Sequence, residues 1–375
     1  MKGSRTVFAI AARRFDKRIF GEQTSYLRGL VSIARRHGMG AYVFSPLDVD
    51  WERKRVKAYV PKGRGWKTVR RPLPDVVHDR VWGLTPEKAK ASQAALRRLE
   101  AEFGIPVFNP DFGDKLEVHA LLAQDPDLAR HLPETLPLSA EAVEKLAGSH
   151  RTLFIKPVRG RQGKGITKAE RTAAGWKAAK QTDSGVAKGA AKDAEALVAF
   201  AARGRDPGEF LVQQGLELAR AGRSAVDIRA IVQRDGRGRW RVSAIGARVG
   251  RRGGFVSNLH AGGKAVSIES LARRLSGRVK AKQLSSSARA LALKVAEKMG
   301  GAHPLLGELG LDLGLDKNGK LWILEVNRQP GRALFSRARL LRSWRTSRVR
   351  VVQYARYLGE RRPGGASEPP AAAGN

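Results

Sequence analysis

Short apolar runs alternate with longer amphipathic segments over the first hundred or so residues, a pattern typical of an α/β unit. The apolar runs predict strands, which we place at 6–12, 41–45, 56–60, 66–69, 75–78 and 107–109. Apolar positions at helical spacing predict helices over 22–36 and 86–102. The strands on either side of Lys62-Gly63-Arg64-Gly65 are expected to form a small hairpin. We therefore expect an α/β domain over residues 1–112.

The pattern predicts a second unit over 113–208 and a third over 209–331. In the second we expect helices at 114–122, 140–147 and 193–202 and a strand at 152–156. Residues 172–192 are rich in Ala, Lys and Gly, carry no clear period and look loosely specified. A strand at 210–214 follows the last of these helices. The third unit is antiparallel in style, with strands at 225–233, 240–248 and 255–258 and a helix at 285–299.

A basic C-terminal segment, 332–358, is expected to hold one amphipathic helix from Ala333 to Leu358. The tail, 359–375, is rich in Gly, Pro and Ala, which predicts disorder.

The strongest local pattern is a hairpin within residues 307–327. Two alternating segments flank Asn318-Gly319, and Asn-Gly favours a two-residue type I′ turn. That turn would place Asp312 directly opposite Glu325. On the other face it pairs Leu311 with Val326, Leu313 with Leu324 and Leu315 with Trp322, a set that we expect to face the core.

Two carboxylates that face each other across a ladder destabilise it, by roughly 3 kcal/mol at 5 Å and an effective dielectric constant near 20. A bound cation would remove that repulsion. Asn327 lies on the same face as Glu325 and adds another oxygen, and an oxygen-only set suits Mg²⁺ better than Zn²⁺. The alternative is a solvated pair whose carboxylates point apart, and a longer or bulged turn would shift the register.

Composition excludes several classes of chemistry. The chain of 375 residues is long enough for two or three domains, and it has no cysteine, which excludes disulfides, thiolate catalysis and cysteine-ligated metals. Its seven histidines show no ligand spacing. The apolar run Val7 to Ala12 is too short for a signal peptide or a membrane span, so we expect a cytoplasmic protein.

The net charge of +36 predicts non-specific attraction to polyanions, whether nucleic acid, anionic lipid or an acidic polymer, without saying which. Much of the charge is scattered, as expected for a basic solvated surface. One denser block has no acidic residue in it and is available to an acidic partner; it comprises Arg332, Arg337, Arg339, Arg342, Arg345, Arg348 and Arg350.

A glycine-rich run from Gly160 to Gly165 follows the predicted strand that ends at Lys156, and it contains Lys164. Glycines allow backbone N–H groups to approach phosphate oxygens, and lysine adds a point charge. The spacing fits neither the P-loop nor the dinucleotide-binding pattern. A plain flexible hairpin is the alternative.

Residues 226–232 alternate strictly, so Asp227 and Arg229 share one face of a strand while Val226, Ile228 and Ala230 share the other. The alternative is an exposed sheet face with a surface ion pair. Arg248 and the segment Ser257-Asn258-Leu259-His260-Ala261-Gly262-Gly263 follow; Asn258 and His260 are otherwise simple turn residues.

The order of these motifs resembles the ATP-grasp superfamily over roughly residues 5–331. The matching features are Phe154-Ile155-Lys156-Pro157, the glycine-rich loop, Phe210 to Gly215, Asp227-x-Arg229, Arg248, the Ser257–Gly263 segment, Asp312 and Glu325-x-Asn327. Within that superfamily the chain is most similar to the YheC/YheD group, described as endospore-coat-associated. The closer match includes Gly21-Glu22-Gln23, Val76-Val77-His78-Asp79-Arg80, Phe108-Asn109-Pro110 and Asp114-Lys115. The segment around Asn258 also resembles RimK-type ligases, which add glutamate to a protein C-terminus.

The resemblance implies an ATP-grasp fold of mixed α+β and α/β character, in which two α+β subdomains clasp ATP behind an α/β pre-ATP-grasp domain. The subdomains would be 113–208, with the glycine-rich loop, and 209–331, with the metal site.

The resemblance also implies roles for individual residues. Lys115 and Lys156 would contact ATP phosphates, and the loop would close over them through Gly160, Gly163, Lys164 and Gly165. The adenine pocket would be lined by Gln213, Gln214, Gly215 and Leu216, with Gln214 or a neighbouring backbone group reading the base edge. Catalysis would fall to Arg229, Arg248 and Asn258, the two arginines holding phosphate or the substrate carboxylate. Two Mg²⁺ ions, or Mn²⁺ in their place, would bind Asp312, Glu325 and Asn327.

The activity implied is that of an ADP-forming carbon–nitrogen ligase: a carboxylate attacks the γ-phosphate of ATP, and an amine captures the resulting acylphosphate. Its partners would be ATP, an unidentified carboxylate donor and an amine acceptor, with an acidic peptide or polymer as one option. An ATP-binding spore-coat protein without ligase turnover is the second hypothesis. A basic nucleic-acid-binding protein is the third, supported by charge but by no recognisable motif.

Overall fold

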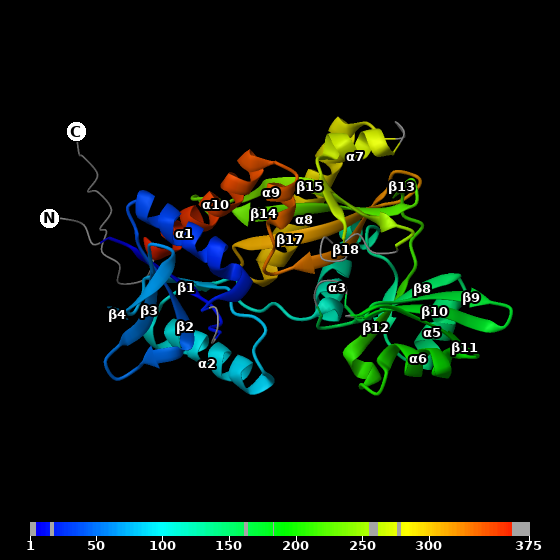
Figure 1. Ribbon diagram of the computed structural model, residues 1–375, viewed down its shortest axis with the longest axis horizontal. Coiled ribbons are helices and arrows are strands. Elements are labelled where there is room, and N and C mark those ends of the chain that lie inside the picture. The colour runs from blue at the N-terminus through cyan, green and yellow to red at the C-terminus, as the bar shows by residue number, and fades with distance from the viewer. Residues whose placement is uncertain are drawn as a thin grey trace.

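The computed structural model describes residues 5–15, 19–160, 164–182, 184–254, 262–275 and 279–361. The strands in this part of the chain form three six-stranded sheets (Figure 1). The first sheet lies at the left of the view, the second at the lower right and the third between and above them. No helix among the described residues is both long enough and apolar enough to cross a membrane.

The first sheet has the order β4-β3-β2-β1-β5-β6, and its strands β2, β1, β5 and β6 run parallel. The strands are β1 Val7–Ala11, β2 Gly40–Asp50, β3 Arg55–Lys62, β4 Gly65–Pro72, β5 Val76–Asp79 and β6 Val107–Phe108. After the short 3-10 helix Gly21–Gln23, α1 (Thr24–Arg36) covers one face, and α2 (Pro86–Phe103) covers the other. The expected α/β unit and its β3–β4 hairpin are confirmed.

The second sheet has the order β11-β10-β9-β8-β12-β7, and α5 (Ala140–Ala147) and α6 (Ala194–Ala202) contribute to its core. Its strands are β7 Thr135–Pro137, β8 Thr152–Pro157, β9 Thr167–Thr172, β10 Gly175–Thr182, β11 Gly185–Ala191 and β12 Phe210–Gln214; the 3-10 helix Pro207–Glu209 precedes β12. The expectation that 172–192 is loosely specified is wrong, because β10 and β11 pair antiparallel there. Trp176, Ala178 and Lys180 of β10 are buried. Alanine and lysine are weak strand formers, which hid this alternation in the sequence.

The third sheet is antiparallel, with the order β16-β15-β14-β17-β18 and β13 beside β14. The strands are β13 Arg220–Ala221, β14 Ser224–Arg234, β15 Trp240–Arg252, β16 Lys264–Val266, β17 Glu308–Leu315 and β18 Leu321–Asn327. One face forms a core with helices α3 Lys115–Ala123, α4 Pro126–Ala129, α7 Ile268–Arg274 and α8 Ala281–Ala302. The prediction that Val226, Ile228 and Ala230 face this core is confirmed. The expected strand at 255–258 lies outside the described residues.

The hairpin of β17 and β18 keeps the predicted opposition of Asp312 and Glu325, but by a different route. The two-residue turn is wrong: residues 316–320 form the connection, where the Asp316 carboxylate accepts hydrogen bonds from the backbone of Asn318 and Lys320. Only Gly319 takes a positive φ, +85°. The longer turn shifts the register by one residue, and a bulge between Asp312 and Leu313 shifts it back.

The bulge changes which side chains of β18 face the core. Leu313 lies opposite Ile323, and Leu315 lies opposite Leu321, so the expected partners Leu324 and Trp322 are wrong. Leu321 and Ile323 are buried in the core in their place. The predicted pair of Leu311 and Val326 is confirmed.

The prediction of a single C-terminal helix is also wrong. The chain forms two helices there, α9 Ala333–Arg337 and α10 Leu341–Gly359. Arg339, between them, has a left-handed φ of 55° that no helix continues. The helix α10 packs on α1 and on the first sheet, in whose core Val351, Val352 and Tyr354 are buried. It therefore joins the N-terminal sheet to the third sheet (Figure 1).

Asn109 holds the first and third sheets together. It is fully buried, with a positive φ of 62°. Its side-chain oxygen accepts hydrogen bonds from the backbone N–H groups of Gly307 and Glu308, both at 2.8 Å. Its amide donates to the carbonyls of Glu308 at 3.0 Å and Arg328 at 2.7 Å. The Phe108-Asn109-Pro110 motif is thus a structural junction.

Candidate functional site

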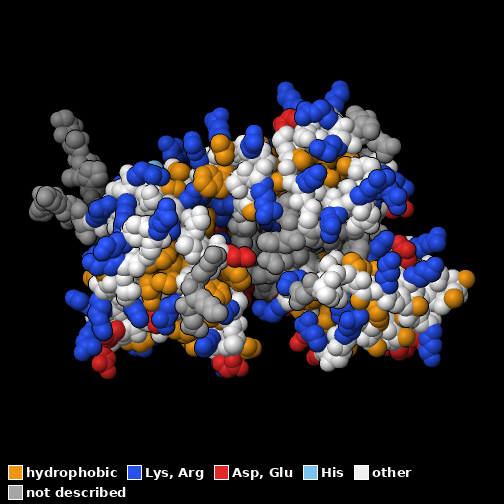
Figure 2. Space-filling view, in the orientation of Figure 1, with side chains coloured by type: hydrophobic (Ala, Val, Ile, Leu, Met, Phe, Trp, Pro, Cys, Tyr) orange, Lys and Arg blue, Asp and Glu red, His pale blue; other side chains and the backbone are white. Residues whose placement is uncertain are grey.

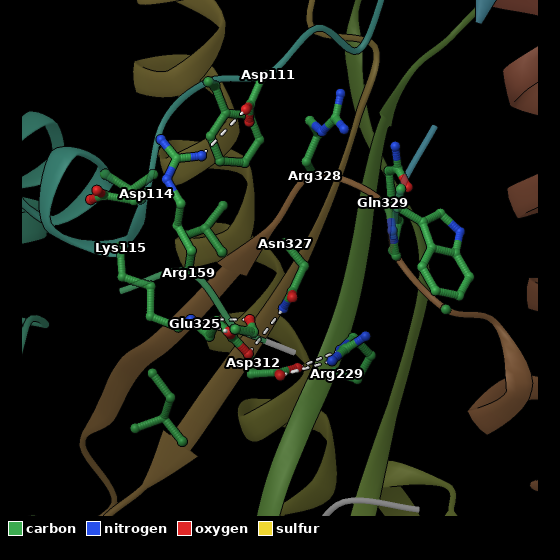
Figure 3. Close-up of a pocket in the computed structure, with 18 of the residues that line it drawn as sticks. Asp111, Asp114, Lys115, Arg159, Arg229, Asp312, Glu325, Asn327, Arg328 and Gln329 are labelled. Atoms are coloured by element: carbon green, nitrogen blue, oxygen red, sulfur yellow. Dashed lines mark hydrogen bonds and ion pairs between the residues drawn. The ribbon is translucent and has the colours of Figure 1, made fainter. Parts of the chain in front are cut away.

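A cavity of about 890 Å³ lies where the three sheets meet. Its walls come from α1 and the end of β5, from the segment before α3, from β8 and β12, and from the face of the third sheet opposite the helical core. Figure 3 shows this cavity, with Asp312, Glu325 and Asn327 side by side on the third sheet and Lys115 beside them.

Asp312 is held between two arginines of the neighbouring strands. Arg229 is its direct partner across β14 and β17 and donates from Nε and, at 2.7 Å, from Nη2. Arg248 of β15 contacts the same carboxylate at 2.9 Å and donates to Asp227 at 2.6 Å. Burial would raise the pKa of Asp312, but the two guanidiniums lower it to about 2. Asp227 and Arg229 share one strand face, as predicted. That face is buried, so the alternative of an exposed sheet face with a surface ion pair is wrong.

Glu325 points toward Asp312 and is more accessible (Figure 3). Lys115 lies 3.5 Å from one of its oxygens, and the Asn327 amide donates to the other at 3.4 Å. The repulsion between the two carboxylates is therefore relieved by cationic side chains as well as by any metal. The alternative of a solvated pair pointing apart does not describe them.

The residues at this end suit a magnesium ion that also binds phosphate. Within the described ranges, no three acidic or histidine side chains converge closely enough to hold a metal unaided. Mg²⁺ usually binds one or two carboxylates together with substrate phosphates and water. Asp312, Glu325 and the Asn327 side chain offer that set on one face of a hairpin.

Lys156 faces the same cavity from β8. Its Nζ donates to Gln213 Oε1 at 2.5 Å, and Gln213 donates in turn to Thr135 Oγ1 at 2.8 Å. Removal from water lowers the pKa of Lys156 to about 8; Glu325 opposes this shift and Lys115 adds to it. Gln213 thus holds the Lys156 ammonium through its side-chain oxygen.

Lys115 begins α3 directly after Asp114, which caps the helix and forms a capping box with Glu117. Its Nζ donates to the carbonyl oxygens of Pro157 and Gly160, both at 3.2 Å. Lys115 therefore connects the metal end of the cavity to the start of the glycine-rich loop.

The loop residues are only partly described. Gly160 lines the cavity, Lys164 is exposed, and Gly165 has a φ of +73° and pairs with Gln181. Gly163 and Asn258 lie outside the described residues.

Three residues expected in the adenine pocket do not line the cavity: Gln214, Gly215 and Leu216. The Gln214 side chain accepts a hydrogen bond from the backbone of Glu134, because successive side chains of a strand point to opposite faces. The apolar residues that do line the cavity include Val118, Val158, Leu211 and Leu324.

Sequence reasoning missed Arg159, which lines the cavity 3.6 Å from Asp111, and Arg328, which follows Asn327 directly. The position of Arg328 right after a proposed metal ligand was the available signal. Around Asp312 and Glu325 the site has a net positive charge, because four cationic side chains accompany three carboxylates: Lys115, Lys156, Arg229, Arg248, Asp227, Asp312 and Glu325. Such a site attracts polyphosphate.

We expect the affinity for the non-hydrolysable ATP analogue AMP-PNP to fall as the pH rises above about 8, by up to tenfold per unit. Lys156 carries its charge below that pH and loses it above, and the phosphates are anionic throughout. Calorimetric titrations from pH 7 to 9.5 would measure this. In Lys156→Arg the charge persists over this pH range. The ratio of the AMP-PNP affinities of the two proteins at each pH therefore removes the effect of the nucleotide's own titration. An identical pH profile for both proteins would contradict the assignment.

The cavity thus lies between two sheets, one of which carries carboxylates and arginines and the other a lysine, as an ATP-grasp fold implies. The chain belongs to the YheC/D-like ATP-grasp family, whose model matches residues 104–358. The family and fold expected from the sequence are confirmed.

Two relatives come from Bacillus subtilis (strain 168). The chain is 30% identical over 348 residues to endospore coat-associated protein YheD, covering 92% of this chain and 76% of YheD. It is 24% identical over 323 residues to endospore coat-associated protein YheC, covering 83% of this chain and 86% of YheC.

Two solved structures share the fold. The ATP-grasp ligase PsnB, complexed with a phosphomimetic variant of its minimal precursor, Mg and ADP, aligns with a TM-score of 0.54 and 16% identity, over 94% of this chain and 100% of PsnB. The VanG D-Ala:D-Ser ligase from Enterococcus faecalis also gives a TM-score of 0.54, with 14% identity, over 94% of this chain and 100% of VanG.

Proposed function

We propose that this protein is an ATP- and Mg²⁺-dependent ligase that joins a carboxylate to an amine. One observation carries the proposal: three oxygen-bearing side chains and four cationic ones converge on one cavity between the sheets. The names of the solved neighbours, which are ligases of this fold, are consistent with it. In this proposal the second and third sheets belong to the two subdomains that clasp ATP; β12 pairs within the second sheet, and α3 and α4 pack on the third.

The proposed reaction has two steps. A carboxylate oxygen of the first substrate attacks the γ-phosphorus of ATP; an O–P bond forms, the bond from that phosphorus to the β–γ bridging oxygen breaks, and ADP leaves. The amine nitrogen then attacks the acyl carbon; a C–N bond forms, the C–O bond to phosphate breaks, phosphate leaves and the nitrogen loses a proton to solvent. Both steps need charge neutralisation and positioning more than a nucleophilic side chain.

The side chains divide this work between them. Lys115 and Lys156 would meet the phosphate oxygens, and Arg229 and Arg248 would hold the γ-phosphate or the carboxylate near Asp312. Mg²⁺ ions, when bound by Asp312, Glu325 and Asn327, supply positive charge to the phosphates. Gly160 and the loop after it would cover the nucleotide. Removing one such charged donor typically lowers a rate a hundredfold or more.

A binding and turnover experiment tests the proposal. Calorimetry should show AMP-PNP binding that strengthens with Mg²⁺, and a screen of amino acids and acidic peptides should yield ADP together with an amide detected by mass spectrometry. Absence of Mg-nucleotide binding would overturn the proposal. Binding without ADP release from any mixture would favour the ATP-binding scaffold, a function that the names of the coat-associated relatives also suit.

A further inference from the structure

The cavity continues well beyond the proposed phosphate site, toward α1 and α10. Glu308 and Asp312 lie on the same face of β17, four residues and therefore roughly 13 Å apart at 3.3 Å per residue. At the Glu308 end the cavity is lined by Tyr26, Arg80, Arg332, Trp344 and Arg348. A substrate that occupies both ends must be elongated.

Two of the arginines at this far end already have an acidic partner. Glu308 is almost fully buried and pairs with Arg332 and, at 3.3 Å, with Arg80. Both guanidiniums also lie against the Tyr26 ring, at 4.9 Å for Arg80 and 4.6 Å for Arg332. One carboxylate therefore serves two arginines, which leaves this end of the cavity positively charged.

Arg348 has no acidic partner among the residues that the structure describes, yet its place is well defined. Its guanidinium stacks on Trp344 at 4.4 Å. On the other side Gly29 of α1 leaves it room, since a Cβ at Gly29 would lie 1.1 Å from Arg348 Nη2. The buried Nε makes no hydrogen bond within the described chain. Burial and the nearby Arg332 and Arg36 lower the pKa of Arg348.

A half-buried cation among other cations is unfavourable unless an anion joins it. We propose that Arg348 binds a carboxylate of an acidic peptide, the substrate whose second, reacting carboxylate lies at Asp312 and Arg229. This inference rests on the proposed ligase function and names the class of its substrate.

Three features favour a peptide. A span of roughly 13 Å corresponds to about four extended residues. The proposed reaction needs a carboxylate, which nucleic acid lacks. Along the same cavity, Gln329 donates from Nε2 to the carbonyls of Asp79 and Val81 and leaves its Oε1 without a hydrogen bond in the described structure, a place for a peptide N–H.

Net charge alone would attract any polyanion, because Lys and Arg side chains are scattered over the face shown in Figure 2 and are more plentiful there than acidic ones. The test therefore needs a control of equal charge. Arg345 is exposed on the same helix, three residues before Arg348, and its replacement removes the same charge.

The probe is fluorescein-labelled hexaglutamate, with binding to the full chain followed by fluorescence anisotropy at saturating Mg²⁺ and AMP-PNP. We expect Arg348→Ala to weaken hexaglutamate binding at least tenfold and Arg345→Ala less than threefold. Gly29→Ala should weaken it as Arg348→Ala does while keeping the arginine, because the new Cβ displaces the flexible guanidinium. Alanine also favours the helix over glycine, so this variant should melt no lower than wild type.

Equal weakening by Arg348→Ala and Arg345→Ala, or no measurable hexaglutamate binding, would overturn the inference. A hexathymidylate that binds as tightly and depends equally on Arg348 would overturn it in favour of a general polyanion site. AMP-PNP affinity, measured on each variant, should stay within twofold of wild type. If wild type binds no AMP-PNP, the ligase proposal itself fails; if it does, and hexaglutamate ignores Arg348, only the peptide subsite fails.

Discussion

Replacing Glu325 with glutamine should lower the rate of ADP release at least a hundredfold, which corresponds to about 2.7 kcal/mol of transition-state stabilisation. Glu325 is the more accessible of the two opposed carboxylates, at 29% side-chain exposure against 8% for Asp312, and it pairs with no arginine in the part of the chain that the structure describes. It is therefore the carboxylate best able to take a metal ion. The Mg²⁺-dependent gain in AMP-PNP affinity should disappear with it.

Rates of ADP release and calorimetric Mg²⁺ titrations would measure this effect. Glu297→Gln is the matched control, an exposed acid on α8, on the far side of the third sheet. It should change neither quantity more than twofold. Full Mg²⁺ dependence in Glu325→Gln would show that this hairpin does not hold the metal.

The largest loss of stability is expected for Glu308→Gln, about 3–5 kcal/mol of unfolding free energy. The Glu308 carboxylate is almost completely buried, pairs with Arg80 and Arg332, and accepts from the Gln233 amide at 2.9 Å. Glutamine keeps the shape but leaves two buried guanidiniums without a counter-charge. Urea denaturation at pH 7 would measure the loss.

The buried Glu308 carboxylate should also make the unfolding free energy depend on pH. Burial would raise the pKa of Glu308, but Arg332, His78 and Arg80 hold it well below its usual range. The contribution of Glu308 to the unfolding free energy is therefore complete above the pKa of the unfolded state, near 4.5. It is lost as the pH falls toward the lower pKa of the folded state. Glu308→Gln should flatten the acid side of the stability profile.

Glu360→Gln removes an exposed partner of Arg356 and should cost less than 1 kcal/mol. If Glu308→Gln is no more destabilising than this control, the junction between the first and third sheets does not depend on the buried charges.

The pairing of Asp312 with Glu325 was predicted correctly, but from a two-residue turn that the structure does not contain. Asn318-Gly319 indicated a two-residue turn, whereas the Asp316 side chain organises a longer one. The bulge restores the pairing because Asp312 must meet Arg229 and Arg248 on one face while Leu311 and Leu313 stay in the core. A bulge depends on contacts with β14, which no pattern within the hairpin reveals.

For the arginines between Arg332 and Arg350, the sequence pattern led to an expectation that the structure changes. In sequence they looked like one basic face available to a partner. In the structure Arg332 is buried against Glu308, Arg350 donates to Ser243, and Arg348 occupies the space beside Gly29. Charge density along the chain did not distinguish these buried and half-buried arginines from exposed ones such as Arg345.

The sequence by itself determined which side chains share a strand face, because the period of two is a local property of extended backbone. It thereby placed Asp227 with Arg229, and Asp312 with Glu325 and Asn327, and it identified the family. Only the tertiary structure decided what surrounds them: Asn109 meets Glu308 across 199 positions, and Arg348 reaches α1 from the last helix. These contacts arise from the packing of three sheets and α10 against one another, and no local period encodes packing between distant segments.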